Sequence, residues 1–299
     1  MSEILDNFSI VFSNYPTLYY CCSFVLGLMV GSFLNVVAFR LPVMMDREMR
    51  EQCAEICGNN NEQAEPASSP EKFNLVVPRS RCGQCGHKIA AWENIPIVSY
   101  LFLKGKCSSC KSPISIQYPL VELTTGLLSA WVAFHYGVCW DTFWVLVVTW
   151  SLIAISIIDI KEMLIPDSIS LPLLWLGLLV NISGTFATPT DAVIGAAAGY
   201  LTLWSVYHVF KLVTGKEGMG YGDFKLLAAL GAWMGWQSLA AIILLSSFVG
   251  AIIGIVGIIA LGRDRQIPIP FGPYLATAGW IYFLYGETIQ AMYAAWLSG

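Results

Sequence analysis

Two aspartates stand at the edges of apolar segments in this sequence, where a pair of acids could carry out acid–base hydrolysis. Asp159 follows the apolar run 152–158, and Asp223 ends a turn with three glycines, residues 218–223. Glycines allow positive φ and close approach of another backbone, such as a substrate strand. Two carboxylates within a few ångströms of each other tend to share one proton. One of them then activates a water, while its protonated partner polarises a carbonyl and later protonates the leaving amine. The pair therefore predicts aspartic-protease chemistry.

Four cysteines form two C-x-x-C pairs whose spacing is typical of a metal site. Cys82 and Cys85 make the first pair and Cys107 and Cys110 the second, with 21 residues between the pairs. Such pairs can direct four thiolates at one tetrahedral ion. Zinc is favoured, and iron in a rubredoxin-like site is the other option. Disulfides are disfavoured in a reducing cytoplasm, and a thioredoxin-like redox pair needs a surrounding α/β unit. We predict a structural zinc, which would supply most of the folding free energy of so small a domain.

The elements that must position these residues are membrane helices. Hydrophobic residues make up 56% of the 299 residues, charged residues 12%, and the mean hydropathy is +0.64. A hydrocarbon core about 30 Å thick needs about 20 apolar residues per helix, and fewer where a helix is broken. We therefore predict an all-α polytopic membrane protein with eight spans, at residues 18–39, 120–136, 142–158, 169–182, 192–210, 224–236, 239–261 and 274–296.

The positions of the basic residues test this map. All 16 lysines and arginines lie in alternate connections: ten between the first and second spans, and the others at Lys161, Lys211, Lys216, Lys225, Arg263 and Arg265. Under the positive-inside rule this face is cytoplasmic, so both termini are expected to be periplasmic. The third span runs inward and the sixth outward, which brings both aspartates to the cytoplasmic boundary. An ionisable group at membrane depth favours a functional role.

Three regions follow from the predicted topology. They are the first span within residues 1–40, a cytoplasmic domain at 41–117 and a seven-helix membrane domain at 118–299. The polar part of the cytoplasmic domain, residues 46–72, is expected to form a helical extension that passes into a loop. Both cysteine pairs fall in the remainder of this domain. The first span is not expected to be a cleaved signal peptide, because its flank is acidic and its apolar run is long.

Several polar residues have structural as well as functional interpretations. Asp223 fits the N-cap of a helix, and for Asp167 an N-cap is favoured over catalysis. Glu122 at the start of the second span could pair with a base, orient a substrate amine or make a buried structural hydrogen bond. Asn35 could bridge two helices. His87 follows a cysteine pair and could replace a ligand, although a surface histidine is the default.

Motifs along nearly the whole chain carry a family resemblance. They are G-S-F-L-N-V at 31–36 with R-L-P at 40–42, the cysteine pairs with K-G-K-C at 104–107, Q-Y-P-L-V-E at 117–122, Asp159 with L-I-P-D at 164–167, G-Y-G-D at 220–223 and I-P-F-G-P at 269–273. With these motifs the chain closely resembles the bacterial type IV prepilin leader peptidases. That family consists of bifunctional aspartic proteases and N-methyltransferases that also process the pseudopilins of type II secretion.

The resemblance implies that Asp159 and Asp223 form the catalytic dyad of a bacterial inner-membrane enzyme. It implies a prepilin or pseudopilin substrate whose short basic leader stays in the cytoplasm and whose scissile bond follows a glycine. The new N-terminal residue would then be methylated with S-adenosylmethionine. Because the sequence has no Rossmann-type glycine-rich turn, the methyl-donor site must be unconventional. The resemblance points to the cytoplasmic domain, where Gly105 and Lys106 are the candidate donor-binding residues and an ordinary turn is the alternative.

Two other functions compete with this interpretation. An intramembrane protease of the presenilin type shares the G-x-G-D chemistry but would lack the cysteine pairs. A transporter could use the two aspartates to carry protons, but the sequence has no inverted repeat, and both aspartates lie at one boundary rather than near the midplane. The expected partners are the pilin-type substrates and the lipid bilayer, and no nucleic acid is expected.

Overall fold

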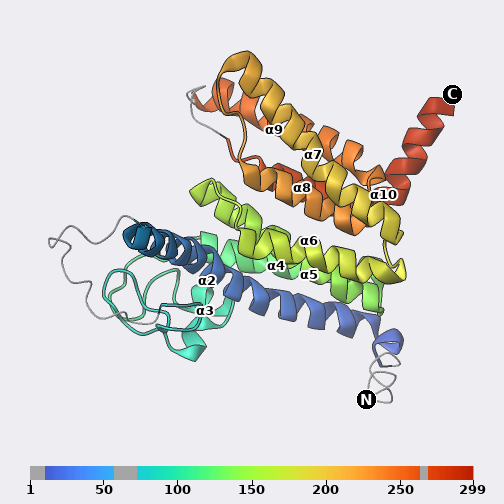
Figure 1. Cartoon of the computed structure of the whole chain (residues 1–299). Coiled ribbons are helices and arrows are strands. Elements are labelled where there is room, and N and C mark those ends of the chain that lie inside the picture. The colour runs from blue at the N-terminus through green and yellow to red at the C-terminus, as the bar shows by residue number, and fades with distance from the viewer. Residues whose placement is uncertain (1–10, 57–72, 263–268, 299) are drawn as a thin grey trace. The chain divides into compact units, whose positions relative to one another are not determined.

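Helices account for most of the chain that the structure describes. This computed structural model describes residues 11–56, 73–262 and 269–298, and within these ranges it has isolated β-bridges but no strand (Figure 1). The long helices are α2 (Pro16–Ile56), α4 (Gln117–Tyr136), α5 (Trp140–Glu162), α6 (Asp167–Val180), α7 (Pro189–Thr214), α8 (Tyr221–Met234), α9 (Gln237–Leu261) and α10 (Gly272–Ser298). The short ones are η1 (Ala91–Asn94), α3 (Val98–Phe102) and η2 (Asn181–Ser183). Each of the eight predicted spans coincides with one of the long helices.

Four helices are long and apolar enough to cross a membrane, judged by length and composition. They are α2, α5, α7 and the portion Gln237–Ile259 of α9. A shorter apolar helix covers Asp167–Ser183. The all-helical membrane architecture is therefore confirmed, while membrane crossing by α4, α6, α8 and α10 stays a prediction.

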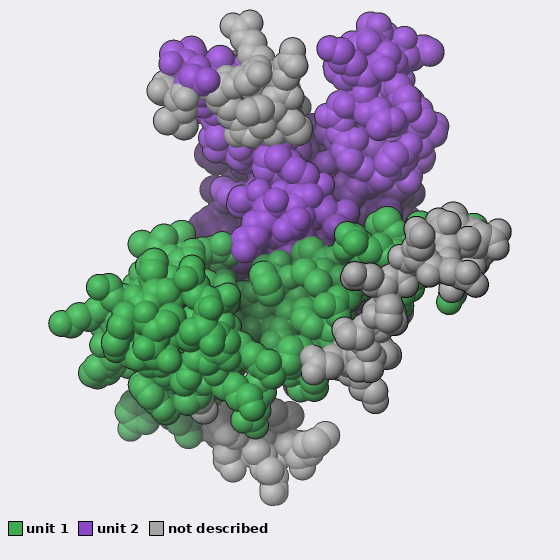
Figure 2. Space-filling model, turned by 90° about the vertical axis from the view of Figure 1, so that its left-hand side faces the viewer, with its two compact units in different colours: residues 1–138 green, residues 139–299 purple. Residues whose placement is uncertain are grey.

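The chain divides into two compact units, residues 1–138 and 139–299 (Figure 2). The predicted domain boundaries at residues 40 and 117 separate membrane segments from a cytoplasmic segment, whereas the two compact units are separated by packing. Those boundaries stay a prediction. The helical extension after the first span is present as far as Ile56. The rest of its predicted loop, residues 57–72, lies outside the described residues, as do Arg263 and Arg265.

In the first unit, α2 and α4 pack through small residues. A Cβ on Gly27 would lie 2.5 Å from Ser129 Oγ, and a Cβ on Gly31 would lie 2.8 Å from the Cα of Glu122. Such residues let the backbones of two membrane helices approach closely. Asn35 adds a polar link, because its Nδ2 donates to the carbonyl of Tyr118 at 3.1 Å. The prediction that Asn35 bridges two helices is confirmed.

In the second unit, α8 is the central helix. It packs against α6, α7, α9 and α10, and the side chains of Phe224 and Trp233 are completely buried. A Cβ on Gly195 of α7 or Gly231 of α8 would overlap the other glycine's carbonyl oxygen, so the two backbones touch. Trp233 Nε1 also donates to the carbonyl of Leu173 in α6 at 2.9 Å. A helix fixed on all sides in this way holds the residues of its first turn in place, and Asp223 is one of them.

Candidate functional site

Asp159 lies in the last turn of α5 and is buried, with 6% of its surface exposed. The helix ends at Met163, which has a φ of 53° and donates its N–H to the carbonyl of Asp159 at 3.0 Å. The Asp159 side chain meets the start of α10, because the Gly272 N–H donates to Oδ2 at 3.0 Å. A Cβ on Gly272 would lie 2.7 Å from that oxygen, so only glycine fits this position without a shift.

Asp223 lies in the first turn of α8 and is also 6% exposed. Asp223 is not at the N-cap, which was the structural alternative for it: Gly220 occupies the N-cap with an extended backbone, and the helix begins at Tyr221. Asp223 is therefore the third helical residue. Its Oδ1 is buried and has no hydrogen-bond partner among the described residues. A buried carboxylate oxygen without a partner is costly, and this one is free to meet a water or a substrate group.

Ile165, a buried residue in the connection between α5 and α6, contacts a glycine next to each of the two acids. A Cβ on Gly222 would lie 2.6 Å from the Cβ of Ile165, and a Cβ on Gly272 would lie 3.0 Å from its Cδ1. Ile165 thus packs against the glycine that precedes Asp223 and against the glycine that binds Asp159. The second unit therefore places two buried acids, 64 positions apart in the sequence, near the same buried isoleucine.

Asp167 has a structural role that differs from the predicted N-cap. Pro166 is the N-cap of α6, and Asp167 is the first helical residue. Both of its carboxylate oxygens accept from Lys225 Nζ at 2.7 Å. This ion pair links the start of α6 to the first turn of α8, two residues after Asp223. The N-cap prediction is wrong because Pro166, with its extended backbone, occupies the capping position itself and leaves Asp167 inside the helix.

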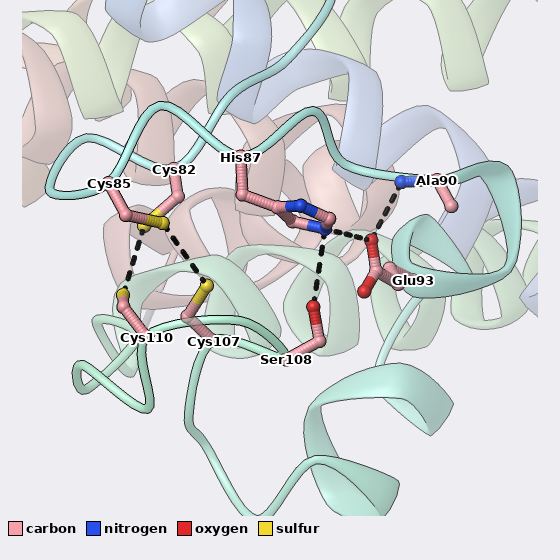
Figure 3. Close-up of polar contacts among 8 residues, drawn as sticks. All are labelled: Cys82, Cys85, His87, Ala90, Glu93, Cys107, Ser108 and Cys110. Atoms are coloured by element: carbon pink, nitrogen blue, oxygen red, sulfur yellow. Dashed lines mark hydrogen bonds and ion pairs between the residues drawn. The ribbon is translucent and has the colours of Figure 1, made fainter.

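The four cysteines of the two C-x-x-C pairs converge on one point (Figure 3). Their Sγ atoms all lie within 4.8 Å of one another, with Cys82 and Cys110 at 3.8 Å and Cys85 and Cys107 at 4.0 Å. A tetrahedral ion with Zn–S bonds of about 2.3 Å places its sulfurs about 3.8 Å apart. None of these cysteines forms a disulfide. The donor set therefore fits zinc, and the metal ligands predicted from spacing are brought together.

Each cysteine pair sits on the same type of turn. In the first, Cys82 N–H donates to the carbonyl of His87 and Gly86 N–H to the carbonyl of Cys82, both at 2.9 Å. In the second, Cys107 N–H donates to the carbonyl of Ser112 at 2.9 Å and Lys111 N–H to that of Cys107 at 3.1 Å. The N–H groups of Cys85 and Gln84, with the Ser112 hydroxyl, lower the pKa of the Cys82 thiol to about 6. A turn that stabilises a thiolate is prepared for a cation.

His87 is not among the metal-binding atoms. Its Nε2 lies 3.3 Å from both Glu93 Oε2 and Ser108 Oγ (Figure 3). The Glu93 side chain is 6% exposed and also accepts from the N–H of Ala90 at 2.7 Å. Hydrogen bonds from Ser108 and Ala90, together with His87, lower the pKa of Glu93. The histidine therefore connects the turn of the first cysteine pair to the turn of the second.

Comparisons with known proteins identify the family. The model of the bacterial peptidase A24 N-terminal domain matches residues 25–136, and that of the type IV leader peptidase family matches residues 146–255. A prepilin leader peptidase/N-methyltransferase of Stutzerimonas stutzeri is 57% identical over 93% of this chain and 94% of its own length. Relatives of the same name from Pseudomonas aeruginosa (55%, covering 94% and 95%) and Dichelobacter nodosus (51%, covering 89% and 92%) are similar too. The chain belongs to the type IV leader peptidase family. No solved structure matches it.

Membership in the leader peptidase family fixes the class of the protein. It is an enzyme, a membrane-bound peptidase that also has N-methyltransferase activity, as its relatives' names state. The presenilin-type and transporter interpretations are therefore set aside.

The candidate donor-binding residues of this peptidase lie in a tight turn. Gly105 has a φ of 67°, and the hydroxyl of Tyr100 lies 2.9 Å from where a Cβ on Gly105 would be. Lys106 forms an isolated bridge with Pro113. These contacts are those of an ordinary turn and do not by themselves identify a donor pocket. Glu122 makes the structural hydrogen bond that was one of its predicted alternatives, accepting from the N–H of Ile97 at 2.8 Å.

Sequence reasoning missed the contacts that Ile165, Lys225 and Gly272 make around the aspartates. Gly272 lies in the I-P-F-G-P motif at 269–273, and no feature of that motif indicates that its N–H points at Asp159.

Replacing Gly272 by alanine is expected to lower leader cleavage by at least about tenfold, since a misplaced catalytic group costs rate steeply. The new Cβ would lie 2.7 Å from Asp159 Oδ2 and would displace that carboxylate from its present position. The measurement is the initial rate of cleavage in detergent. Thr277→Ala, an exposed change on the same helix, is the control and should cleave normally. Unaltered cleavage by Gly272→Ala would contradict the role given to this contact.

Proposed function

We propose that this enzyme removes the basic leader of type IV prepilins and pseudopilins, with Asp159 and Asp223 as its catalytic pair. The observation that carries the proposal is the pair of buried carboxylates, each 6% exposed, around Ile165. An ionisable group at membrane depth is costly, so two buried acids near one isoleucine favour a functional role. The names of the relatives supply the substrate class.

The proposed hydrolysis uses the two acids in one protonation state, with one proton shared between them. The ionised carboxylate takes a proton from a water as the water oxygen attacks the carbonyl carbon of the leader's last glycine. The protonated carboxyl donates to the carbonyl oxygen and stabilises the tetrahedral diol. When the C–N bond breaks, the carboxyl that took the water proton passes it to the leaving nitrogen, and a hydroxyl of the diol returns its proton to the other carboxylate as the C=O bond re-forms. The products are a leader acid and a mature chain with a free amine, and the dyad keeps its single proton.

The site is expected to face the cytoplasm of a bacterial inner membrane. The 16 basic residues of the chain all fall on the predicted face where both aspartates lie, and both termini fall on the other. A substrate with a basic leader and a hydrophobic helix would insert its helix among the spans. Its leader would stay in the cytoplasm, so the scissile bond would be held at the depth of the two carboxylates.

The second activity would act on the amine that cleavage exposes. S-adenosylmethionine, the proposed donor, supplies a methyl group on a sulfonium. Gly105 and Lys106 remain the proposed donor-binding residues, on the strength of the family resemblance. We further propose that Cys82, Cys85, Cys107 and Cys110 hold a structural zinc, because their four sulfurs have the spacing of a tetrahedral site. The zinc would fix both turns of this domain, and the turn with Gly105 adjoins Cys107.

The proposed function is tested on the reaction product. Purified enzyme in detergent is incubated with a type IV prepilin, with and without S-adenosylmethionine, and the products are weighed by mass spectrometry. The expected result is a mature chain that starts directly after the leader glycine, with an added methyl group only when the donor is present. An uncut prepilin, or cleavage at another bond, would contradict the proposal.

A further inference from the structure

One apolar segment of the first unit exposes large side chains in the part of the chain that the structure describes. Residues 94–103 carry no charge and include α3, and none of the α3 side chains is buried. Val98 is 44% exposed, Leu101 68% and Phe102 82%. Tyr100, on the other face, packs against Gly105. One face of this five-residue helix packs on its own domain, and the other face is apolar and exposed. Such an exposed apolar face is unusual in water.

A single hydrogen bond fixes the depth of this segment relative to the helices. Ile97, the residue before α3, has a φ of 60° and donates its N–H to Glu122 Oε2 at 2.8 Å. Glu122 lies within α4, not at its end, and is 8% exposed. Its backbone lies against Gly31 of α2, where an added Cβ would be 2.8 Å from it. Ile97 is therefore level with Glu122 and near the level of Gly31.

That level is inside the apolar part of both helices. α2 is a candidate membrane span, and its uncharged stretch ends at Phe39, just before Arg40. Gly31 lies eight residues before Phe39, or about 12 Å along the helix at about 1.5 Å per residue. Glu122 lies five residues after the first residue of α4, or about 7.5 Å along that helix. Two independent helices thus put the start of α3 below the surface of the bilayer.

We propose that residues 94–103 dip into the cytoplasmic leaflet of the bilayer, with Val98, Leu101 and Phe102 in contact with lipid acyl chains. The start of α4 adds further apolar side chains, among which Leu120 is 59% exposed. Lys104, which is exposed, follows the segment, so that end returns to the water; at the other end Glu93 is bonded to Ala90 and His87 within the domain. Lys104 and Lys106 follow α3 directly, where phosphate headgroups would lie.

The backbone around α3 meets the strict requirement that a membrane imposes. Non-helical backbone is tolerated at membrane depth only where its N–H and C=O groups have partners in the protein. The Ile97 N–H is such a group, and Glu122 provides its acceptor. The Ser99 and Leu101 N–H groups donate to the carbonyls of Ile95 and Ile97 at 3.1 and 3.0 Å. Glu122 is thus a positioning residue for the segment, which explains why an acid lies inside an apolar helix.

This placement would hold the cysteine turns at the membrane surface. Only four residues separate Phe102 from Cys107. A domain anchored by two spans and a lipid-inserted helix cannot swing freely in the cytoplasm.

The test places a fluorescent non-natural amino acid at position 102 of the full-length protein. The protein is reconstituted in vesicles of phosphatidylethanolamine and phosphatidylglycerol, with or without bromine on the acyl chains. Brominated chains are expected to quench the probe, and iodide in the water is expected to leave it bright. The matched control is the same probe at Lys88, which is exposed in the same domain, and the opposite pattern is expected there. The same probe placed at Leu101 should show the same quenching pattern, which would exclude an effect specific to position 102.

Two Glu122 variants test the hydrogen bond separately. Glu122→Gln keeps an acceptor oxygen and should leave the quenching of the 102 probe unchanged, whereas Glu122→Met removes the acceptor and should reduce it. Quenching of the 102 probe by iodide but not by bromine would overturn the proposal. Equal bromine quenching at 102 and 88 would also overturn it. If neither quencher reached position 102, a protein partner rather than lipid would cover the segment, and the proposal would fail.

Discussion

Replacing either Asp159 or Asp223 by asparagine is expected to slow leader cleavage by at least about 10³-fold, because general acid–base catalysis contributes about 10²–10⁴-fold and each acid serves in both steps. Asparagine has nearly the same shape as aspartate but can neither take a proton from water nor donate an acidic one. Both side chains are buried, so bulk water cannot replace the missing group. The measurement is single-turnover cleavage of a prepilin in detergent, followed by mass spectrometry.

The control for this prediction is Asp141→Asn, the same chemical change at the other end of α5. It should cleave at the normal rate. Methylation of an already cleaved pilin offers a second readout, since the proposed donor-binding residues lie in the other unit of the chain. Both dyad variants should retain it if they are folded. Normal cleavage by Asp159→Asn or Asp223→Asn would remove that residue from the mechanism, and loss of both activities would indicate a folding defect instead.

The helices could be predicted because the hydrocarbon thickness imposes a length on apolar segments. The eight predicted segments coincide with α2 and α4 to α10. Their ends could not be predicted as well. At Asp223 and Asp167, the choice between N-cap and first-turn positions depends on the backbone of the preceding residues. Gly220 and Pro166 are extended and act as N-caps without a side-chain bond, so both aspartates lie inside their helices.

The packing around the aspartates was beyond what the sequence could reveal. The contact of Gly272 with Asp159 joins residues 113 positions apart. Ile165 looks like any apolar residue in a short connection, yet it touches the glycines beside both acids. No local pattern encodes such contacts, because they arise only when α5, α8 and α10 pack together. The cysteines differ from this case. Within each C-x-x-C pair, the local spacing already places two sulfurs close together, so only the approach of the two turns depends on the overall fold.

Changing Cys82 or Cys107 to serine is expected to release the metal and unfold the domain around the cysteine turns. Purified enzyme should contain about one zinc per chain, and each variant close to none, because a serine hydroxyl is a poor replacement for a thiolate. Structural zinc in small peptides contributes about 10–16 kcal/mol of apparent binding free energy, whereas a typical hydrogen bond adds about 1 kcal/mol. The bonds of His87 with Glu93 and Ser108 join the two turns but cannot replace the metal. The measurements are zinc by elemental analysis and amide exchange at Cys82 and Cys107, whose N–H groups are bonded within the turns.

Cys53→Ser is the matched control, because this exposed cysteine on α2 lies outside the four-sulfur cluster. It should keep both the zinc and the slow amide exchange. The metal site is in the first unit and the two acids in the second, so the zinc-free variants should still insert in the membrane through their apolar helices. Iron in place of zinc would leave the geometry intact and change only the metal. Metal-free wild-type enzyme with protected amides at Cys82 and Cys107 would contradict the site, because hydrogen bonds alone would then be holding two turns whose four sulfurs converge on one point.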